Sequence, residues 1–196
     1  TKLVNQIETH IFDAFVPEKK IKASIVALGS SDSQEIMGED VHVLPLGSSL
    51  YVADATGTNE YAVIRRVISR DQRYLNFPMV QKDWLSELLK YQKIEPLEDR
   101  GAVLGMHQGS CKYDVQVDGE SPGEKSFQVT YLNYKQKIFG REFGFGSGYY
   151  LISNLPEGFH NIQVRCHEKG TLSQQVVLVD RSVLNIVYSK FSTQMK

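Results

Sequence analysis

The sequence lacks several features that define large classes of protein. It has 196 residues but only two cysteines, and no apolar run reaches the roughly 18 residues that a membrane-spanning helix needs. The first ten residues contain no apolar core of the kind found in signal peptides. The 22 lysines and arginines nearly balance the 23 aspartates and glutamates, so the formal net charge is −1. We therefore expect no transmembrane segment and no nucleic-acid partner.

Motifs for catalysis and for binding metals or cofactors are also missing. No two of the five histidines form a His-x-x-x-His pair, and the cysteines are not spaced as Cys-x-x-Cys. The sequence contains no Gly-x-x-x-x-Gly-Lys-Ser/Thr phosphate loop and no Gly-x-Ser-x-Gly nucleophile turn. It therefore predicts a protein that is not an enzyme, with no catalytic residue, no metal ligand and no cofactor.

The two cysteines, Cys111 and Cys166, leave two alternatives open. One disulfide is typical of an exported protein, whereas two thiols fit a cytosolic protein equally well. Sequence spacing does not show whether the two Cα atoms approach within the roughly 4.4–6.8 Å that a disulfide requires. The pair is therefore a candidate disulfide.

Residues 1–97 predict a β-rich N-terminal region with two helices. Four apolar residues near the start recur at spacings of four: Leu3, Ile7, Ile11 and Phe15. This spacing predicts a helix near residues 3–15. Alternating apolar residues predict strands within 21–28, 40–46 and 50–68. Apolar residues at helical spacing around Trp84 predict a second helix near 81–92.

Residues 101–191 predict an all-β domain. Short segments that alternate apolar and polar residues are separated by turn residues, as at Asp118-Gly119. Several short strands with regular turn signals favour a β-sandwich or barrel. The polar segment 95–101 contains proline and glycine and predicts the boundary between the halves. The expected fold class is therefore mainly β.

The segment GYYLISNLPEGFHNIQV, residues 148–164, carries the most specific pattern. Nine residues fit it: Gly148, Tyr150, Ile152, Leu155, Pro156, Gly158, His160, Ile162 and Val164. Five of them are expected to point inward from two neighbouring strands: Tyr150, Ile152, Leu155, Ile162 and Val164. The segment resembles the carboxypeptidase-regulatory-like modules, also called transthyretin-like or prealbumin-like β-sandwiches. The resemblance covers residues 101–191 and implies an Ig-like or transthyretin-like sandwich. It also implies a structural or adhesive role in an exported bacterial protein.

Residues 21–68 resemble a degenerate second copy of the same module. Seven residues carry this resemblance: Gly38, Val41, Val43, Asp54, Gly57, Tyr61 and Val63. The segment departs from the pattern of the family at two points. Ala53 occupies a position where threonine is usual, and no Leu-Pro-x-Gly follows. The resemblance implies an internal duplication.

A competing resemblance lies around the second helix. Val80 precedes Asp83, Trp84 and Leu85 in a pattern similar to the end of a BRCT domain, a phosphopeptide-binding fold. It implies an intracellular module that binds a phosphorylated partner. The basic cluster for that phosphate would be Arg65, Arg66, Arg70 and Arg73.

The glycine-rich segment 140–148 holds a candidate binding loop. Arg141, Phe143 and Phe145 form an exposed tip in one interpretation, whereas the phenylalanines fill the core in the other. The expected function is a non-catalytic structural or protein-binding component of the bacterial cell envelope, at the surface, in the periplasm or in a pilus or secretion assembly. The expected partner is another protein, bound through loops or by addition of a strand at a sheet edge.

Overall fold

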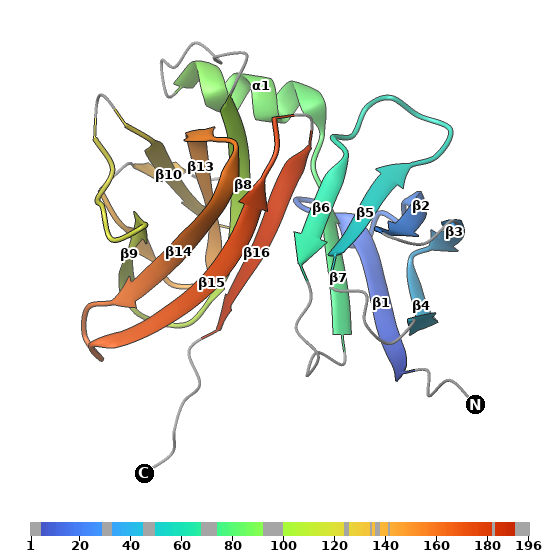
Figure 1. Ribbon diagram of the computed structural model, residues 1–196, viewed down its shortest axis with the longest axis horizontal. Helices are drawn as coiled ribbons and strands as arrows, with labels where there is room; N and C mark the ends of the chain where they lie inside the picture. Colours follow the sequence, from blue (N-terminus) through green and yellow to red (C-terminus); the bar gives the residue numbers. More distant parts are fainter. Residues whose placement is uncertain are drawn as a thin grey trace. The chain divides into compact units, whose positions relative to one another are not determined.

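The structure is a computed structural model of the chain, drawn as a ribbon in Figure 1. It describes residues 5–28, 33–44, 50–67, 74–91, 100–123, 126–133, 135, 138–140, 142–181 and 183–190. The fold is mainly β, as the sequence predicts, with several sheets and one short helix among these residues. In the same residues, no helix is both long and apolar enough to cross a lipid bilayer.

The chain divides into two compact units, unit 1 (Thr1–Leu88) and unit 2 (Leu89–Lys196). The division lies within the helix α1 (Lys82–Tyr91), which was predicted near residues 81–92. Most of the boundary predicted at residues 95–101 lies outside the described residues, because positions 95–99 are not described. The predicted domain limits of 1–97 and 101–191 therefore stay predictions.

Unit 1 contains two groups of paired strands. One has the order β4-β1-β7, formed by β1 (Asn5–Asp13), β4 (Glu39–Leu44) and β7 (Tyr74–Met79). The other has the order β6-β5-β2-β3, formed by β2 (Lys22–Ala27), β3 (Ser33–Met37), β5 (Leu50–Ala55) and β6 (Ile64–Val67). Gly38, with a φ of 71°, carries the chain from β3 in one group to β4 in the other (Figure 1).

The helix predicted near residues 3–15 is wrong, because Asn5–Asp13 form strand β1. β1 pairs antiparallel with β4 and parallel with β7. Residues four apart share a face in a strand as well as in a helix, so the spacing of Ile7 and Ile11 fits both. The buried residues of β1 alternate along the strand, at Thr9, Ile11 and Asp13. Two of the three are polar, so the sequence shows no alternation of apolar and polar residues here.

Asp13 is a buried carboxylate that joins three segments of unit 1. Its Oδ1 accepts the N–H groups of Phe15 and Val16 at 2.9 and 3.1 Å. Its Oδ2 accepts the Tyr61 hydroxyl at 2.9 Å and the Gln81 side-chain amide at 3.0 Å. These four hydrogen bonds offset the cost of removing the carboxylate from water. They hold the end of β1 beside the segment that leads into α1.

Unit 2 has a β-sandwich-like architecture, and its core draws on both of its sheets. The first sheet has the order β11-β10-β13-β8-β16, with β8 (Arg100–Gln108), β10 (Gln128–Asn133), β11 (Ile138–Gly140), β13 (Gly148–Pro156) and β16 (Leu184–Lys190). The second has the order β12-β9-β14-β15, with β9 (Lys112–Val117), β12 (Gly144–Phe145), β14 (Gly158–Cys166) and β15 (Thr171–Val179). β16 pairs with β8 in parallel, although the two strands lie at opposite ends of the unit's sequence.

The Pro156–Gly158 corner connects the two sheets of this sandwich. β13 pairs with β8 and β10, whereas β14 pairs with β9 and β15, so the two strands face each other across the core. Gly158 has a φ of 131°, a conformation that favours glycine. All five residues expected to point inward are in the core: Tyr150, Ile152, Leu155, Ile162 and Val164. The family resemblance and the duplication over 21–68 remain predictions.

Tyrosines fill much of the core of unit 2. The Tyr113 ring packs edge-on against Tyr131 and Tyr150, with ring centroids 5.6 and 6.3 Å apart. The Tyr131 hydroxyl accepts the Val115 N–H at 3.0 Å, and the Tyr150 hydroxyl lies 3.0 Å from Ser189 Oγ. Burial raises the pKa of both tyrosines above the ordinary value, so both phenols are neutral at physiological pH.

Two residues of β8 fit closely against these rings. Gly105 lies so near Tyr150 that a Cβ atom at this position would overlap the tyrosine ring. His107 is fully buried, and its ring centroid lies 3.9 Å from that of Tyr113. Burial lowers the pKa of His107 from its usual 6.5 to about 4. The imidazole is therefore neutral at pH 7.

Acid should destabilise unit 2 through His107. Between pH 6.5 and about 4 the unfolded chain binds a proton here that the folded chain excludes. The free energy of unfolding should therefore fall with falling pH, by at most about 1.4 kcal/mol per pH unit from this group. Urea titrations over this range should show a smaller decrease for His107→Phe than for the wild type. An equal slope in His107→Phe and in the wild type would contradict the prediction.

Candidate functional site

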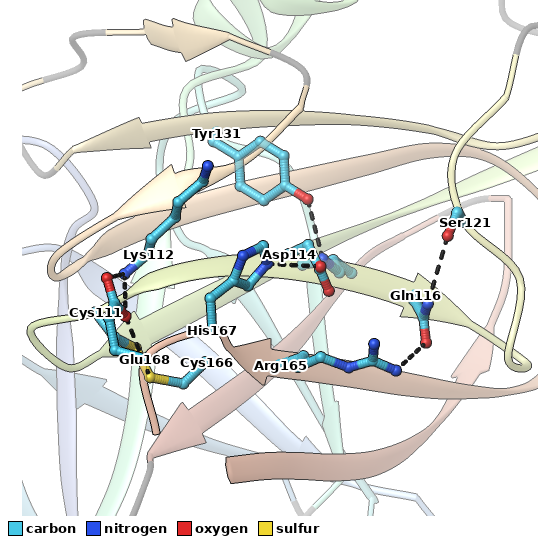
Figure 2. Close-up of polar contacts among 11 residues, drawn as sticks. Cys111, Lys112, Asp114, Gln116, Ser121, Tyr131, Arg165, Cys166, His167 and Glu168 are labelled. Carbon is cyan, nitrogen blue, oxygen red and sulfur yellow. Dashed lines mark hydrogen bonds and ion pairs between the residues drawn. A yellow bond between two sulfur atoms is a disulfide. The ribbon is translucent and has the colours of Figure 1, made fainter. Parts of the chain in front are cut away.

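The end of unit 2 near the cysteines brings together four of the residues singled out from the sequence. Cys111 precedes β9 and Cys166 ends β14, and these neighbouring strands pair antiparallel. The structure joins the two cysteines in a disulfide, with their Cα atoms 5.8 Å apart (Figure 2). Both cysteines are buried on the core side of the sheet. The disulfide therefore fixes the end of the sheet from which the candidate binding loop extends.

The candidate binding loop lies beside the disulfide and presents its phenylalanines to solvent. Gly144 pairs with Tyr113, and a Cβ atom at Gly144 would overlap the Tyr113 ring. Because Gly144 faces the core, its neighbours face outward, and Phe143 and Phe145 are 38% and 56% exposed. The interpretation that these phenylalanines fill the core is therefore wrong. Arg141, the third residue of this loop, lies outside the described residues.

A cation lies over one of these exposed rings. Lys112 Nζ is 3.9 Å from the centroid of the Phe143 ring, a cation–π distance. Phe145 pairs with Lys112 across the β12–β9 ladder, and the Gly146 N–H donates to the Cys111 carbonyl at 3.1 Å. Backbone hydrogen bonds to β9 and to Cys111 therefore hold the loop in place. We call Lys112, Phe143 and Phe145 the aromatic tip.

Polar side chains form a row on β9, on β14 and just after β14, and the row includes the neighbours of Lys112 of the aromatic tip (Figure 2). His167 Nε2 lies 2.7 Å from Asp114 Oδ2, and Arg165 donates to Gln116 Oε1 at 3.4 Å. The Glu168 carboxylate accepts the Lys112 N–H at 3.1 and 3.0 Å. This backbone hydrogen bond is the main reason that the pKa of Glu168 lies below its ordinary value. Glu168 is therefore ionised at neutral pH, and the row offers charged and polar groups that are suited to polar recognition.

Two histidines of unit 2, His160 and His167, contact carboxylates and have structural roles. His167 is bound to Asp114, as above. His160 Nδ1 lies 2.7 Å from Asp118 Oδ2, and its Nε2 lies 2.9 Å from the Pro156 carbonyl oxygen. Neither histidine contacts a serine, threonine or cysteine side chain among the described residues. A His-activated nucleophile, which needs such a contact, therefore has no support at these positions.

One group of potential metal ligands consists of the two disulfide cysteines and a neighbouring carboxylate. The ligand atoms of Cys111, Cys166 and Glu168 lie within 4.8 Å of one another. A cysteine binds metal as a thiolate, and both sulfur atoms are already joined in the disulfide. Glu168 alone remains, so this group does not form a metal site while the disulfide is intact.

A second exposed apolar area, which the sequence analysis did not predict, lies on the outer face of β14 and β15. Phe159 is 75% exposed, and Leu172 and Val176 are also exposed. The sequence signal was present in QQVVLVD, where apolar residues occupy both faces of β15, the last strand of its sheet. Such a run does not by itself identify an exposed face, because apolar runs also occur in strands that are buried on both faces.

The basic cluster proposed for phosphate binding is only partly described. Arg65 and Arg66 are both buried, and Arg66 Nη1 donates to the Asn76 carbonyl. Arg70 and Arg73 lie outside the described residues. Two of the four arginines therefore do not offer an exposed basic surface.

Comparisons with known proteins do not assign the chain to a family. No protein-family model matches the sequence, and a search of curated proteins finds no significant match.

Proposed function

We propose that this chain is a non-catalytic, protein-binding component of the bacterial cell envelope, at the surface, in the periplasm or in a pilus or secretion assembly. The observation that carries the proposal is the aromatic tip, where Phe143 and Phe145 are exposed beside a charged row of side chains. Exposed aromatic residues next to polar and charged groups are typical of protein interfaces. Backbone pairing of β12 with β9 pre-orders the loop, which lowers the entropy lost on binding.

The disulfide supports an exported location. Disulfides form and persist in oxidising compartments and are rare in the cytosol of most organisms. Cys111 and Cys166 lie next to the aromatic tip. Export to an oxidising compartment would therefore form the disulfide that holds the proposed binding surface in shape.

Two features bear on how a partner binds. The sequence predicted addition of a strand at a sheet edge, and β15 is the last strand of its sheet. However, the Gln175 side chain accepts the Tyr188 N–H at 3.0 Å and donates to the Tyr188 carbonyl, which ties β15 to β16. A strand added beside β15 would have to displace these contacts. Binding through the aromatic tip requires no such displacement and is therefore the mode that we favour.

Site-specific crosslinking tests the aromatic tip as a binding surface. A photo-crosslinking amino acid in place of Phe145 should give one adduct of defined mass in envelope fractions, because this side chain is exposed at the proposed interface. The same residue at Glu157, which is exposed on the Pro156–Gly158 corner, is the matched control and should give none. A Phe143→Ser/Phe145→Ser variant should melt at the wild-type temperature but lose the complex. A complex that survives both serines would contradict the proposal.

A thiol count tests the compartment. Protein isolated without reductant and then denatured should contain no reactive thiol, since both cysteines are in the disulfide. Two reactive thiols would contradict export and favour the alternative, an intracellular BRCT-like phosphopeptide-binding module. That alternative has less support because Arg65 and Arg66 are buried.

A further inference from the structure

Three side chains at the disulfide end of unit 2 could share one metal ion once the disulfide is reduced. The sulfur atoms of Cys111 and Cys166 and a carboxylate oxygen of Glu168 all lie within 4.8 Å of one another (Figure 2). Among the residues that the structure describes, no other group of three histidine, cysteine or acidic side chains is gathered in this way. In the oxidised protein the two sulfur atoms are bonded to each other. Reduction would free both for another bond.

The backbone holds these side chains together independently of the disulfide. The pairing of β9 with β14 reaches Cys166, and the next hydrogen bond, from the His167 N–H to the Lys112 carbonyl at 2.9 Å, continues it. The Glu168 carboxylate accepts the Lys112 N–H at 3.1 and 3.0 Å. The Cα atoms of Cys111 and Cys166, 5.8 Å apart, are thus held by strand pairing as well as by the crosslink. We therefore expect reduction to leave both thiols beside the carboxylate.

The spacing of the three donor atoms suits a tetrahedral zinc ion. Zinc binds thiolate sulfur at about 2.3 Å and carboxylate oxygen at about 2.0–2.2 Å, so its donors lie about 3.5–3.8 Å apart in a tetrahedral site. Cys166 Sγ is already 3.8 Å from Glu168 Oε2 in the oxidised protein. Atoms that are not bonded to each other pack about 3.5–4.0 Å apart, so reduction itself should move the two sulfur atoms toward the zinc geometry.

The chemistry of the donors favours zinc over other ions. Thiolates select zinc, copper(I) or iron–sulfur clusters, whereas a carboxylate favours harder ions. Zinc is borderline between these classes and accepts both kinds of donor. The Lys112 N–H orients the Glu168 carboxylate, as an outer-shell hydrogen bond does in metal sites. Both cysteines are buried and Glu168 is exposed, so the ion and a water molecule would enter from the side of Glu168.

We propose that reduced unit 2 binds one zinc ion through Cys111 Sγ, Cys166 Sγ and a carboxylate oxygen of Glu168, with water as the fourth ligand. A dithiol reductant donates two electrons and two protons to the disulfide and is itself oxidised to a disulfide. Each cysteine thiol then releases one proton when it binds the metal. The same two cysteines therefore join β9 to β14 in both redox states. The proposal goes beyond the aromatic tip, because it concerns the chain whenever its disulfide is not formed.

Titration of the reduced full chain with cobalt(II) tests the site, because cobalt replaces zinc and its absorption reports the ligands. A phosphine is the suitable reductant, since it adds no competing thiol. The reduced chain should bind one equivalent of cobalt, with thiolate-to-cobalt charge-transfer absorption and the d–d bands of a tetrahedral ion, and zinc should displace the cobalt. The oxidised chain should show neither absorption. A reduced chain without the charge-transfer absorption would overturn the proposal.

Variants identify the ligands. Glu168→Ala keeps both cysteines and should weaken cobalt binding by at least about tenfold, since loss of even an outer-shell partner costs that much. Glu157→Ala, which removes another exposed carboxylate far from the cysteines in the sequence, is the matched control and should keep the wild-type affinity. Cys111→Ala/Cys166→Ala should lose the charge-transfer absorption altogether. Equal affinity in Glu168→Ala and in the control would remove Glu168 from the ligands and contradict the proposed site.

Stability measurements distinguish the folded site from metal binding by the unfolded chain. An ion that binds only the folded state raises the free energy of unfolding by mass action. Chemical denaturation of the reduced wild type, followed by tyrosine circular dichroism, should therefore give a higher midpoint with zinc than with a chelator. The Cys111→Ala/Cys166→Ala variant should show the same midpoint in both conditions. If zinc does not raise the midpoint of the reduced wild type, the folded unit does not hold the ion and the proposal fails.

Discussion

A Gly105→Ala variant is expected to lose the native packing of unit 2. The added methyl group would overlap the ring of Tyr150, which is fully buried and has no open space into which to move. Over-packing a dense core costs typically about 1–3 kcal/mol and occasionally more, and a direct overlap with an aromatic ring belongs to the upper end. Near-UV circular dichroism should show loss of the tyrosine signal, and thermal denaturation should give a lower or a broadened transition.

Two further variants make this prediction specific. Gly123→Ala is the matched control, because the nearest atom to its added Cβ is the movable Ser126 hydroxyl oxygen at 3.3 Å. It should melt within a few degrees of the wild type. The cost of combining Gly105→Ala with Tyr150→Val should be smaller than the sum of the two single costs, since the smaller side chain leaves room for the methyl group. A Gly105→Ala protein as stable as the Gly123→Ala control would refute the argument.

Removing the disulfide should destabilise unit 2 by about 4 kcal/mol, the chain-entropy estimate for a crosslink whose cysteines are 55 residues apart. Cys111→Ala/Cys166→Ala is the suitable variant, because both positions are buried and a serine hydroxyl would need a partner. Chemical denaturation followed by tyrosine circular dichroism should show the loss. Trp84, the only tryptophan, lies in unit 1, and its fluorescence provides an internal reference.

Reduction of the wild type is the control for this experiment. A reductant should lower the denaturation midpoint of the wild type to that of the double alanine variant, and it should not affect the variant itself. If the wild type and the variant unfold at the same denaturant concentration without reductant, the crosslink does not stabilise unit 2 and the prediction fails.

The sequence predicted the mainly β fold and the inward-facing residues around Pro156, because strand periodicity and turn residues are local signals. It failed at β1, where apolar residues four apart fit a helix and a strand alike and the buried Asp13 broke the alternation. Burial of a carboxylate can be predicted only when its hydrogen-bond partners are known. Two partners of Asp13, Tyr61 and Gln81, are distant in the sequence.

The candidate site was predictable in its residues but not in its arrangement. Cys111, Cys166, Phe143 and Phe145 were all singled out, yet their proximity depends on the pairing of β9 with both β12 and β14. The register shift at Asn154 had no sequence signal, because it arises in the pairing of β13 with β8. Register is set by tertiary packing and is not a property of one segment.

The parallel pairing of β8 with β16 has a consequence for the synthesis of this protein. β8 is among the first strands of unit 2 to leave the ribosome and β16 is the last, so the sheet stays incomplete until the end of the unit has been made. Contacts between such distant segments form slowly, because the long intervening chain must first be ordered. Unit 2 should therefore remain unfolded through most of translation, the state in which a polypeptide can be threaded through a narrow translocation channel. Deleting β16 should leave β8 with an unpaired edge and convert the unit into an aggregation-prone chain.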